Sequence, residues 1–287
     1  MRTGSASRLA HLMDLDLQQI GLSHPRIKQI VDLQRNTASN RAGMLGVEGL
    51  WAHNVVRETG TQVAVFLCCP EAIYSDEAKL RATQLVDIAE ASYRISEKTL
   101  ARITERDKPD GLVSIVRMPN WQRGDIEFGE TALVLVADGL EIPGNLGTVL
   151  RTMDGVAADC MVLTNRRTRM SHPKVFRGSH GMSLSVPTVD FDEVTEAIDW
   201  LAGHDFRVYL ADTESAVDYR MADYSGRVAM VVGSERYGIS RPWYERGYGG
   251  IFIPMLGRAD SLNVSVSASV LLYQARAAQG GARGGPR

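Results

Sequence analysis

Three short segments in the second half of the chain combine glycine with amide, hydroxyl or guanidinium side chains. They are Asn145-Leu-Gly-Thr-Val-Leu-Arg151-Thr152, Val231-Val-Gly233-Ser-Glu235, and Ile253-Pro-Met255 followed by Ser261-Leu-Asn263-Val-Ser265. Each comes where an apolar run ends, at positions that a packed core would fill with bulky side chains. We expect the three to act together on a ligand, because a few polar groups in a cleft orient a substrate and a guanidinium binds phosphate.

The first segment predicts a helix that begins beside the ligand. Pro143-Gly144 indicates a turn, Asn145 is expected to cap the following helix, and Gly147 permits close backbone approach. Arg151 follows Asn145 by about one and two-thirds helical turns, and we expect both to face one crevice. An amide and a forked guanidinium at a helix start suit a phosphate-bearing substrate. A capped surface helix with a solvated arginine is the alternative.

The other two segments differ in how specific they are. Gly233, Ser234, Glu235 and Gly238 predict a tight loop, but it is neither a Walker loop nor a dinucleotide fingerprint. The third segment places several serines and Asn263 at the start of the last helix, where such side chains pack poorly. Ligand capture explains this cluster better than core packing does.

Length and composition indicate one large or two modest globular domains. The chain has 287 residues, of which 44% are hydrophobic and 23% are charged. Its longest apolar runs are too short for a transmembrane helix, and the N-terminus lacks a secretory signal, so we expect a cytoplasmic protein without a membrane partner. Cys68, Cys69 and Cys160 have no zinc-ligand spacing. We expect buried, inert thiols and no metal.

The formal net charge of −2 argues against binding nucleic acid by overall electrostatics. One local segment, 166–180, is nevertheless basic and contains no acidic residue. Its cations are Arg166, Arg167, Arg169, Lys174 and Arg177. They predict contacts with several phosphates, with a solvated loop as the alternative.

The pattern of apolar runs and breaker residues predicts the domain organisation. We expect a leader over 1–24, a small α/β domain over 25–118, a linker over 119–130, a larger domain over 131–279 and a flexible tail over 280–287. In the larger domain, apolar strands at 133–137, 161–164, 208–211, 228–232 and 251–253 alternate with helices at 146–153, 194–201 and 262–278. This alternation predicts an α/β fold with a parallel sheet covered on both faces. Ligands bind beyond the carboxyl ends of such strands, where all three segments fall.

The three segments, with His172-Pro-Lys174-Val-Phe-Arg177-Gly-Ser179-His-Gly181 between them, resemble the motifs of the SpoU/TrmH family of RNA 2′-O-ribose methyltransferases in the SPOUT superfamily. The resemblance covers residues 131–279. The N-terminal unit is similar to the substrate-binding domain that many rRNA enzymes of this family carry. The resemblance implies a sheet ending in a C-terminal trefoil knot, a homodimer, and S-adenosyl-L-methionine as the cofactor.

The resemblance also implies roles for individual residues. Arg151, Asn145, Glu235, Ser261 and Asn263 would form the catalytic group. The cofactor would be held by Ala211, Asp212, Thr213, Gly233, Ser234, Ile253, Met255 and Leu262. RNA would contact Arg35, Arg41 and the five cations of segment 166–180. Because arginine stays protonated, we favour Arg151 as a phosphate anchor over Arg151 as a base with a depressed pKa.

The resemblance implies methyl transfer to a ribose 2′-hydroxyl in RNA. Large-subunit rRNA is favoured over tRNA because of the N-terminal domain, and both housekeeping and antibiotic-resistance roles are open. A non-catalytic RNA-binding member of the fold would be expected to have lost Asn145, Arg151, Glu235 or Asn263, and all four are present. A metabolic nucleotide-binding enzyme is disfavoured, because the chain lacks the glycine-rich phosphate-binding patterns of the Walker loop and the dinucleotide fingerprint.

Overall fold

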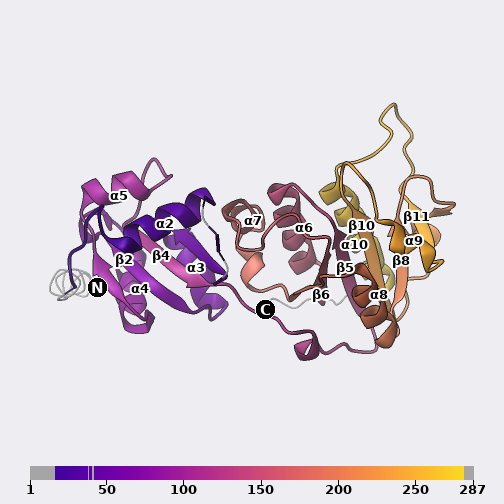
Figure 1. Ribbon diagram of the computed structural model, residues 1–287, viewed down its shortest axis with the longest axis horizontal. Coiled ribbons are helices and arrows are strands. Elements are labelled where there is room, and N and C mark those ends of the chain that lie inside the picture. The colour runs from indigo at the N-terminus through magenta and orange to yellow at the C-terminus, as the bar shows by residue number, and fades with distance from the viewer. Residues whose placement is uncertain (1–16, 38, 41, 281–287) are drawn as a thin grey trace. The chain divides into compact units, whose positions relative to one another are not determined.

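The computed structural model describes residues 17–37, 39, 40 and 42–280, which form two compact units (Figure 1). One unit runs to Pro119 and includes Ser171–Pro173; the other consists of Asn120–Met170 and the chain from Lys174 onward. Most of the predicted leader, the predicted tail beyond residue 280, and Arg41 lie outside the described residues. In the described ranges, no helix is long and apolar enough to cross a membrane.

The N-terminal unit is built on a four-stranded mixed sheet with the strand order β1-β4-β2-β3. The strands are β1 (Met44–Glu48), β2 (Val63–Cys68), β3 (Ser92–Arg94) and β4 (Leu112–Arg117). The helices are α2 (Pro25–Arg35), α3 (Leu50–Glu58), α4 (Asp76–Ile88) and α5 (Glu97–Ile103), with a short 3₁₀ turn at Pro70–Ala72. Ile20, within the segment predicted as a leader, is buried in the core of this unit beside Ile27 and Leu67.

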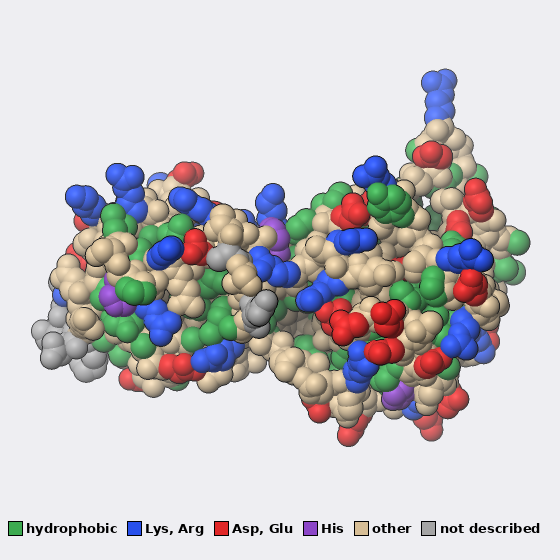
Figure 2. Space-filling view, in the orientation of Figure 1, with side chains coloured by type: hydrophobic (Ala, Val, Ile, Leu, Met, Phe, Trp, Pro, Cys, Tyr) green, Lys and Arg blue, Asp and Glu red, His purple; other side chains and the backbone are tan. Residues whose placement is uncertain are grey.

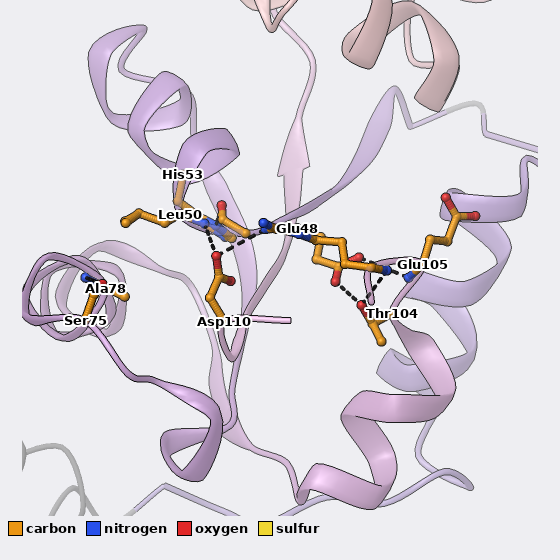
Figure 3. A network of polar contacts seen from close by, with 10 residues as sticks. Glu48, Leu50, His53, Ser75, Ala78, Thr104, Glu105 and Asp110 are labelled. Carbon is orange, nitrogen blue, oxygen red and sulfur yellow. Dashed lines mark hydrogen bonds and ion pairs between the residues drawn. The ribbon is translucent and has the colours of Figure 1, made fainter. Parts of the chain in front are cut away.

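A polar network joins the start of α3 to the loop before β4 (Figure 3). Gly49 precedes the helix and offers no side-chain cap. The Asp110 carboxylate caps the helix instead. Its Oδ2 accepts a hydrogen bond from the Leu50 N–H at 2.8 Å and forms an ion pair with Arg106 at 3.1 Å. A carboxylate stabilises the positive end of a helix dipole, so Asp110 fixes where α3 begins.

His53 on α3 is completely buried. Its ring nitrogens lie 2.7 Å from the Gly49 carbonyl and 2.8 Å from the Ser114 hydroxyl. Burial lowers the pKa of His53 to about 4, because the interior disfavours the imidazolium. The ring is therefore neutral at physiological pH and ties α3 to β4.

The C-terminal unit contains a seven-stranded sheet, β7-β6-β5-β10-β8-β11-β9, in which every pairing is parallel. The strands are β5 (Ala132–Asp138), β6 (Cys160–Thr164), β7 (Thr188–Asp190), β8 (Arg207–Ala211), β9 (Val217–Asp218), β10 (Arg227–Gly233) and β11 (Gly249–Phe252). The predicted parallel α/β sheet is confirmed. β7 and β9 were not predicted, because two or three residues are too few to show a period.

Helices cover both faces of this sheet (Figure 1). Leu133, Leu135 and Ala137 of β5 pack with α6 (Pro143–Gly155) and α10 (Val264–Ala278). Val134 and Val136 pack with α8 (Val194–Gly203) and α9 (Arg241–Glu245) on the other face. The remaining elements are α7 (Pro173–Gly178), inside the basic segment, and 3₁₀ turns at Arg123–Asp125, Met182–Leu184 and Tyr219–Met221. Double coverage explains why the strands are apolar at nearly every position.

The segment predicted as a linker packs on the C-terminal unit. Trp121, Ile126 and Phe128 lie against the core cluster that includes α8. The Arg123 guanidinium lies 3.8 Å from the centroid of the Phe191 ring, a cation–π contact.

The three cysteines are buried and unbridged, as predicted. Burial raises the pKa of each thiol, to about 11 for Cys69. These thiols are therefore protonated and unreactive at physiological pH.

Candidate active site

A cavity of about 480 Å³ lies in the C-terminal unit where β8 and β10 end, at Ala211 and Gly233. A smaller hollow of about 50 Å³ shares residues 211–213 with it and extends to the segment after β11. All eight residues predicted to hold the cofactor line one or both: Ala211, Asp212, Thr213, Gly233, Ser234, Ile253, Met255 and Leu262.

The cavity is anionic. Two carboxylates, Asp212 and Glu235, line it, and none of the described residues around it is Lys or Arg. Negative charge in a cleft attracts cations and repels polyphosphates. The cavity thus suits a ligand with a positive centre, in agreement with the absence of a phosphate-binding glycine pattern.

Asp212 is held in place by a residue that sequence reasoning missed. The Tyr244 hydroxyl on α9 donates to Asp212 Oδ2 at 2.6 Å, and the Glu214 N–H donates to Oδ1 at 3.0 Å. Burial, followed by this hydrogen bond, raises the pKa of Tyr244, so the phenol stays protonated. One tyrosine in a short helix has no distinguishing sequence pattern, and only the fold shows its role.

The loop after β10 is a tight hairpin. Ser234 and Gly238 exchange two backbone hydrogen bonds, of 3.1 Å and 2.9 Å, and the Ser234 hydroxyl accepts from the Tyr237 N–H at 2.9 Å. Gly238 has a φ of +68°, the left-handed conformation that closes a three-residue hairpin loop. A Cβ on Gly233 would lie 2.1 Å from the Gly238 carbonyl carbon, so only glycine fits there.

A buried carboxylate anchors this loop to the neighbouring strands. Asp138, at the end of β5, accepts hydrogen bonds from the Thr164 hydroxyl at 2.9 Å and the Asn165 amide at 2.7 Å. Its second oxygen accepts from the Ser240 N–H at 2.7 Å. These bonds compensate the burial of the carboxylate and hold the ends of β5 and β6 against the hairpin.

Hydrogen bonds connect the three predicted segments. The side-chain amide nitrogen of Asn145 donates to the Glu235 carboxylate, and the side-chain Oδ1 of Asn145 accepts from the Asn263 amide at 3.3 Å. Asn263 in turn accepts from the backbone N–H of Ser265 at 2.9 Å and from its hydroxyl at 2.6 Å. Among the predicted catalytic residues, Glu235, Ser261 and Asn263 line the cavity, and Asn145 binds two of them.

The prediction that Asn145 caps α6 is wrong. The helix begins at Pro143, with Ile142 at the cap position and no side-chain cap. Proline lacks the N–H that a cap would satisfy and has a helical φ, so it starts a helix on its own. Asn145 lies within the first turn, which frees its amide to bind Glu235 and Asn263.

Arg151 and Asn145 do not share one face of α6. At about 100° per residue, six residues put the two side chains about 120° apart around the helix. Arg151 is exposed and does not line the cavity, and its side chain makes no hydrogen bond or ion pair with another described residue. Thr152 lies near the face of Asn145 instead, and its hydroxyl is 2.8 Å from that of Ser269 on α10.

The predicted RNA-binding cations lie on several elements. Arg35 is at the exposed end of α2, and Arg166, Arg167, Lys174 and Arg177 are exposed, whereas Arg169 is half-buried. Arg166 forms an ion pair of 2.8 Å with Asp190, so the basic segment has an acidic neighbour in space that its sequence does not show. On the face drawn in Figure 2, Lys and Arg are interspersed with Asp and Glu, in keeping with the net charge near zero.

Known proteins resemble the chain along most of its length. Residues 132–273 match the SpoU rRNA methylase family. A solved RNA 2′-O ribose methyltransferase is 30% identical, with a TM-score of 0.74 and coverage of 91% of this chain and 99% of that chain. The chain belongs to the SpoU family.

Further relatives agree with this family. The AdoMet-bound rRNA methyltransferase from Sinorhizobium meliloti is 25% identical, with a TM-score of 0.80 and coverage of 91% of this chain and 97% of that one. The 23S rRNA (guanosine(2553)-2′-O)-methyltransferase RlmP of Bacillus subtilis is 27% identical over 206 residues, 72% of this chain and 80% of RlmP. The family predicted from the three segments is confirmed.

Proposed function

We propose that this SpoU enzyme methylates a ribose 2′-hydroxyl of large-subunit rRNA. RNA 2′-O-ribose methylation with S-adenosyl-L-methionine as the donor is the activity that its family and its structural relatives support. The observation that carries the proposal is the hydrogen-bonded group of Asn145, Glu235 and Asn263 beside an anionic cavity at the strand ends. The rRNA target is favoured over tRNA because the relative from Sinorhizobium meliloti, an rRNA enzyme, matches 91% of this chain.

The cavity fits the cofactor chemically. When bound there, S-adenosyl-L-methionine supplies a methyl group activated by a positive sulfonium. Asp212, fixed by Tyr244, and Glu235 give the cavity the negative charge that complements this cation. The eight lining residues predicted above would hold the cofactor, with backbone groups of the Gly233 loop among them.

Glu235 is the residue that we propose orients the ribose hydroxyl. Its Oε1 accepts from Asn145, which leaves Oε2 for the 2′-hydroxyl proton. Arg151 faces away from Asn145 and would bind a phosphate of the RNA next to the target ribose, because a guanidinium remains charged and suits phosphate geometry. The phosphate itself is the alternative proton acceptor.

We also propose that the enzyme is a homodimer. Val266 and Tyr273, seven residues apart and so on one face of α10, are 47% and 58% exposed. A second copy of α10 would cover this apolar stripe. Size-exclusion chromatography with light scattering tests it: the wild type is expected to be dimeric and Tyr273→Glu monomeric, and a monomeric wild type would refute it. The C-terminal trefoil knot and the cytoplasmic location stay predictions.

The activity is tested by transfer of labelled methyl from S-adenosyl-L-methionine to separate rRNA and tRNA preparations, followed by mapping of the modified nucleotide. Label in 23S rRNA is expected, and Asn145→Ala serves as the impaired control. Label in tRNA alone would show that the substrate is tRNA and not rRNA. Protein that binds the cofactor and labels neither RNA would contradict the catalytic role.

A further inference from the structure

Tyr237 stands on the hairpin that carries Glu235 and is 69% exposed. The hairpin is rigid at this point, because the Tyr237 N–H is bound by the Ser234 hydroxyl and Gly238 closes the loop through two backbone bonds. The ring belongs to neither of the two hydrophobic core clusters described for the C-terminal unit. A large aromatic side chain held on a rigid, exposed loop is available for an external partner.

Arg236 lies beside this ring. Its guanidinium carbon is 5.1 Å from the ring centroid, within cation–π range. The contact with arginine still leaves Tyr237 69% exposed. Arg236 also brings a positive charge next to Glu235, which favours the approach of a polyanion.

The ring is close to the chemistry but outside the cofactor cavity. Two residues of chain span at most about 7 Å, so the Tyr237 Cα lies within that distance of the Glu235 Cα. Glu235 and Gly238 line the cavity, whereas Tyr237 does not. Tyr237 thus lies outside the cavity proposed for the cofactor, on the loop that the RNA must approach to reach Glu235.

We propose that Tyr237, supported by Arg236, is a stacking platform for an unpaired nucleobase next to the methylated nucleotide. The inference rests on the proposed RNA methyltransferase activity and adds a preference for unpaired nucleotides. Every base offers a flat face to an aromatic ring, but a base inside a duplex has both faces covered by its neighbours. The platform thus favours a target in a loop, bulge or single strand.

The test compares Tyr237→Ala with Tyr237→Phe, which keeps the ring and serves as the matched control. Both variants are expected to fold, because the side chain is exposed. Tyr237→Ala should raise the KM for 23S rRNA about tenfold, within the range of base–aromatic stacking, and leave kcat and cofactor affinity unchanged. Tyr237→Phe should match the wild type.

A second arm does not depend on catalysis. A single-stranded RNA containing 2-aminopurine is titrated with each protein, beside the same strand in a duplex. Stacking on Tyr237 should quench the fluorescence of the single strand, and Tyr237→Ala should remove this quenching and weaken binding about tenfold.

Three results would overturn the platform. One is unchanged RNA affinity in Tyr237→Ala. Another is an equal loss of RNA affinity in Tyr237→Phe, which would assign the effect to the phenol hydroxyl. The third is a loss of RNA affinity in Arg236→Ala but not in Tyr237→Ala, which would reduce the site to a phosphate contact. If the wild type methylates no RNA, the activity fails, and the fluorescence arm still decides whether the platform exists.

Discussion

Gly233→Ala tests whether close packing of the hairpin on β10 sets the geometry of the active site. A Cβ at this position would lie 2.1 Å from the Gly238 carbonyl carbon, 2.2 Å from the Ile239 nitrogen and 2.3 Å from the Gly238 oxygen. All three are backbone atoms, which cannot rotate away. The hairpin must therefore move as a whole.

The size of that movement follows from the distances. Ordinary van der Waals contact begins near 3.4 Å, so the backbone around Gly238 must shift by more than 1 Å. Glu235 lies within the same hairpin and moves with it. A displacement of about 1 Å at reacting groups can cost about a hundredfold in rate, and we expect a loss of that order in kcat/KM.

Methyl transfer to rRNA and calorimetric titration of cofactor binding measure the effect. Cofactor affinity should fall as well, since Gly233 and Ser234 line the cavity. Gly203→Ala at the end of α8 is the matched control, because a Cβ there meets nothing within 4 Å. Thermal unfolding shows that both variants are folded at the assay temperature. A folded Gly233→Ala enzyme with wild-type kcat/KM would refute the argument.

Asn145→Ala removes the donor to Glu235, and we expect single-turnover methyl transfer to slow about tenfold, the lower end for a hydrogen bond to a charged group at an exposed site. An unchanged rate would show that Glu235 needs no orienting partner. Arg151→Lys keeps the positive charge but loses the guanidinium that can bind a phosphate with two hydrogen bonds, so methyl transfer should slow about tenfold or more with unchanged cofactor affinity. Near-normal single-turnover rates with intact RNA binding would contradict the role of Arg151 as a phosphate anchor. Folding lowers the pKa of His53 from 6.5 to about 4. Between these two pH values the unfolded chain holds a proton on His53 that the folded protein does not, so the free energy of unfolding decreases as the pH falls from 6.5 towards 4. Urea unfolding should show a loss of about 2 kcal/mol between pH 7 and pH 5 that His53→Gln lacks, and equal pH slopes in the two proteins would disprove it.

The longer strands of the larger sheet were predictable because burial on both faces demands nearly continuous apolar runs, as in β5. β7 and β9 were not predicted, because they are too short to show a period, and the start of α6 differs from the predicted one. There, Asn145 is a good cap in general, but Pro143 already begins the helix. Tyr244 was missed because nothing near it in sequence signals its bond to Asp212.

The sequence by itself determined the chemistry: which segments carry amides, hydroxyls and carboxylates, that each follows a strand, and which family they resemble. Only the tertiary structure decided which of these groups meet. Asn145 reaches Glu235 across 90 residues and Asn263 across 118, because the parallel order β5-β10-β8-β11 brings the ends of those strands to one edge. Arg151, six residues from Asn145, faces elsewhere because helical rotation carries it away. Spacing along a chain sets the direction of a side chain within one element, and contacts between elements depend on the order of strands in the sheet.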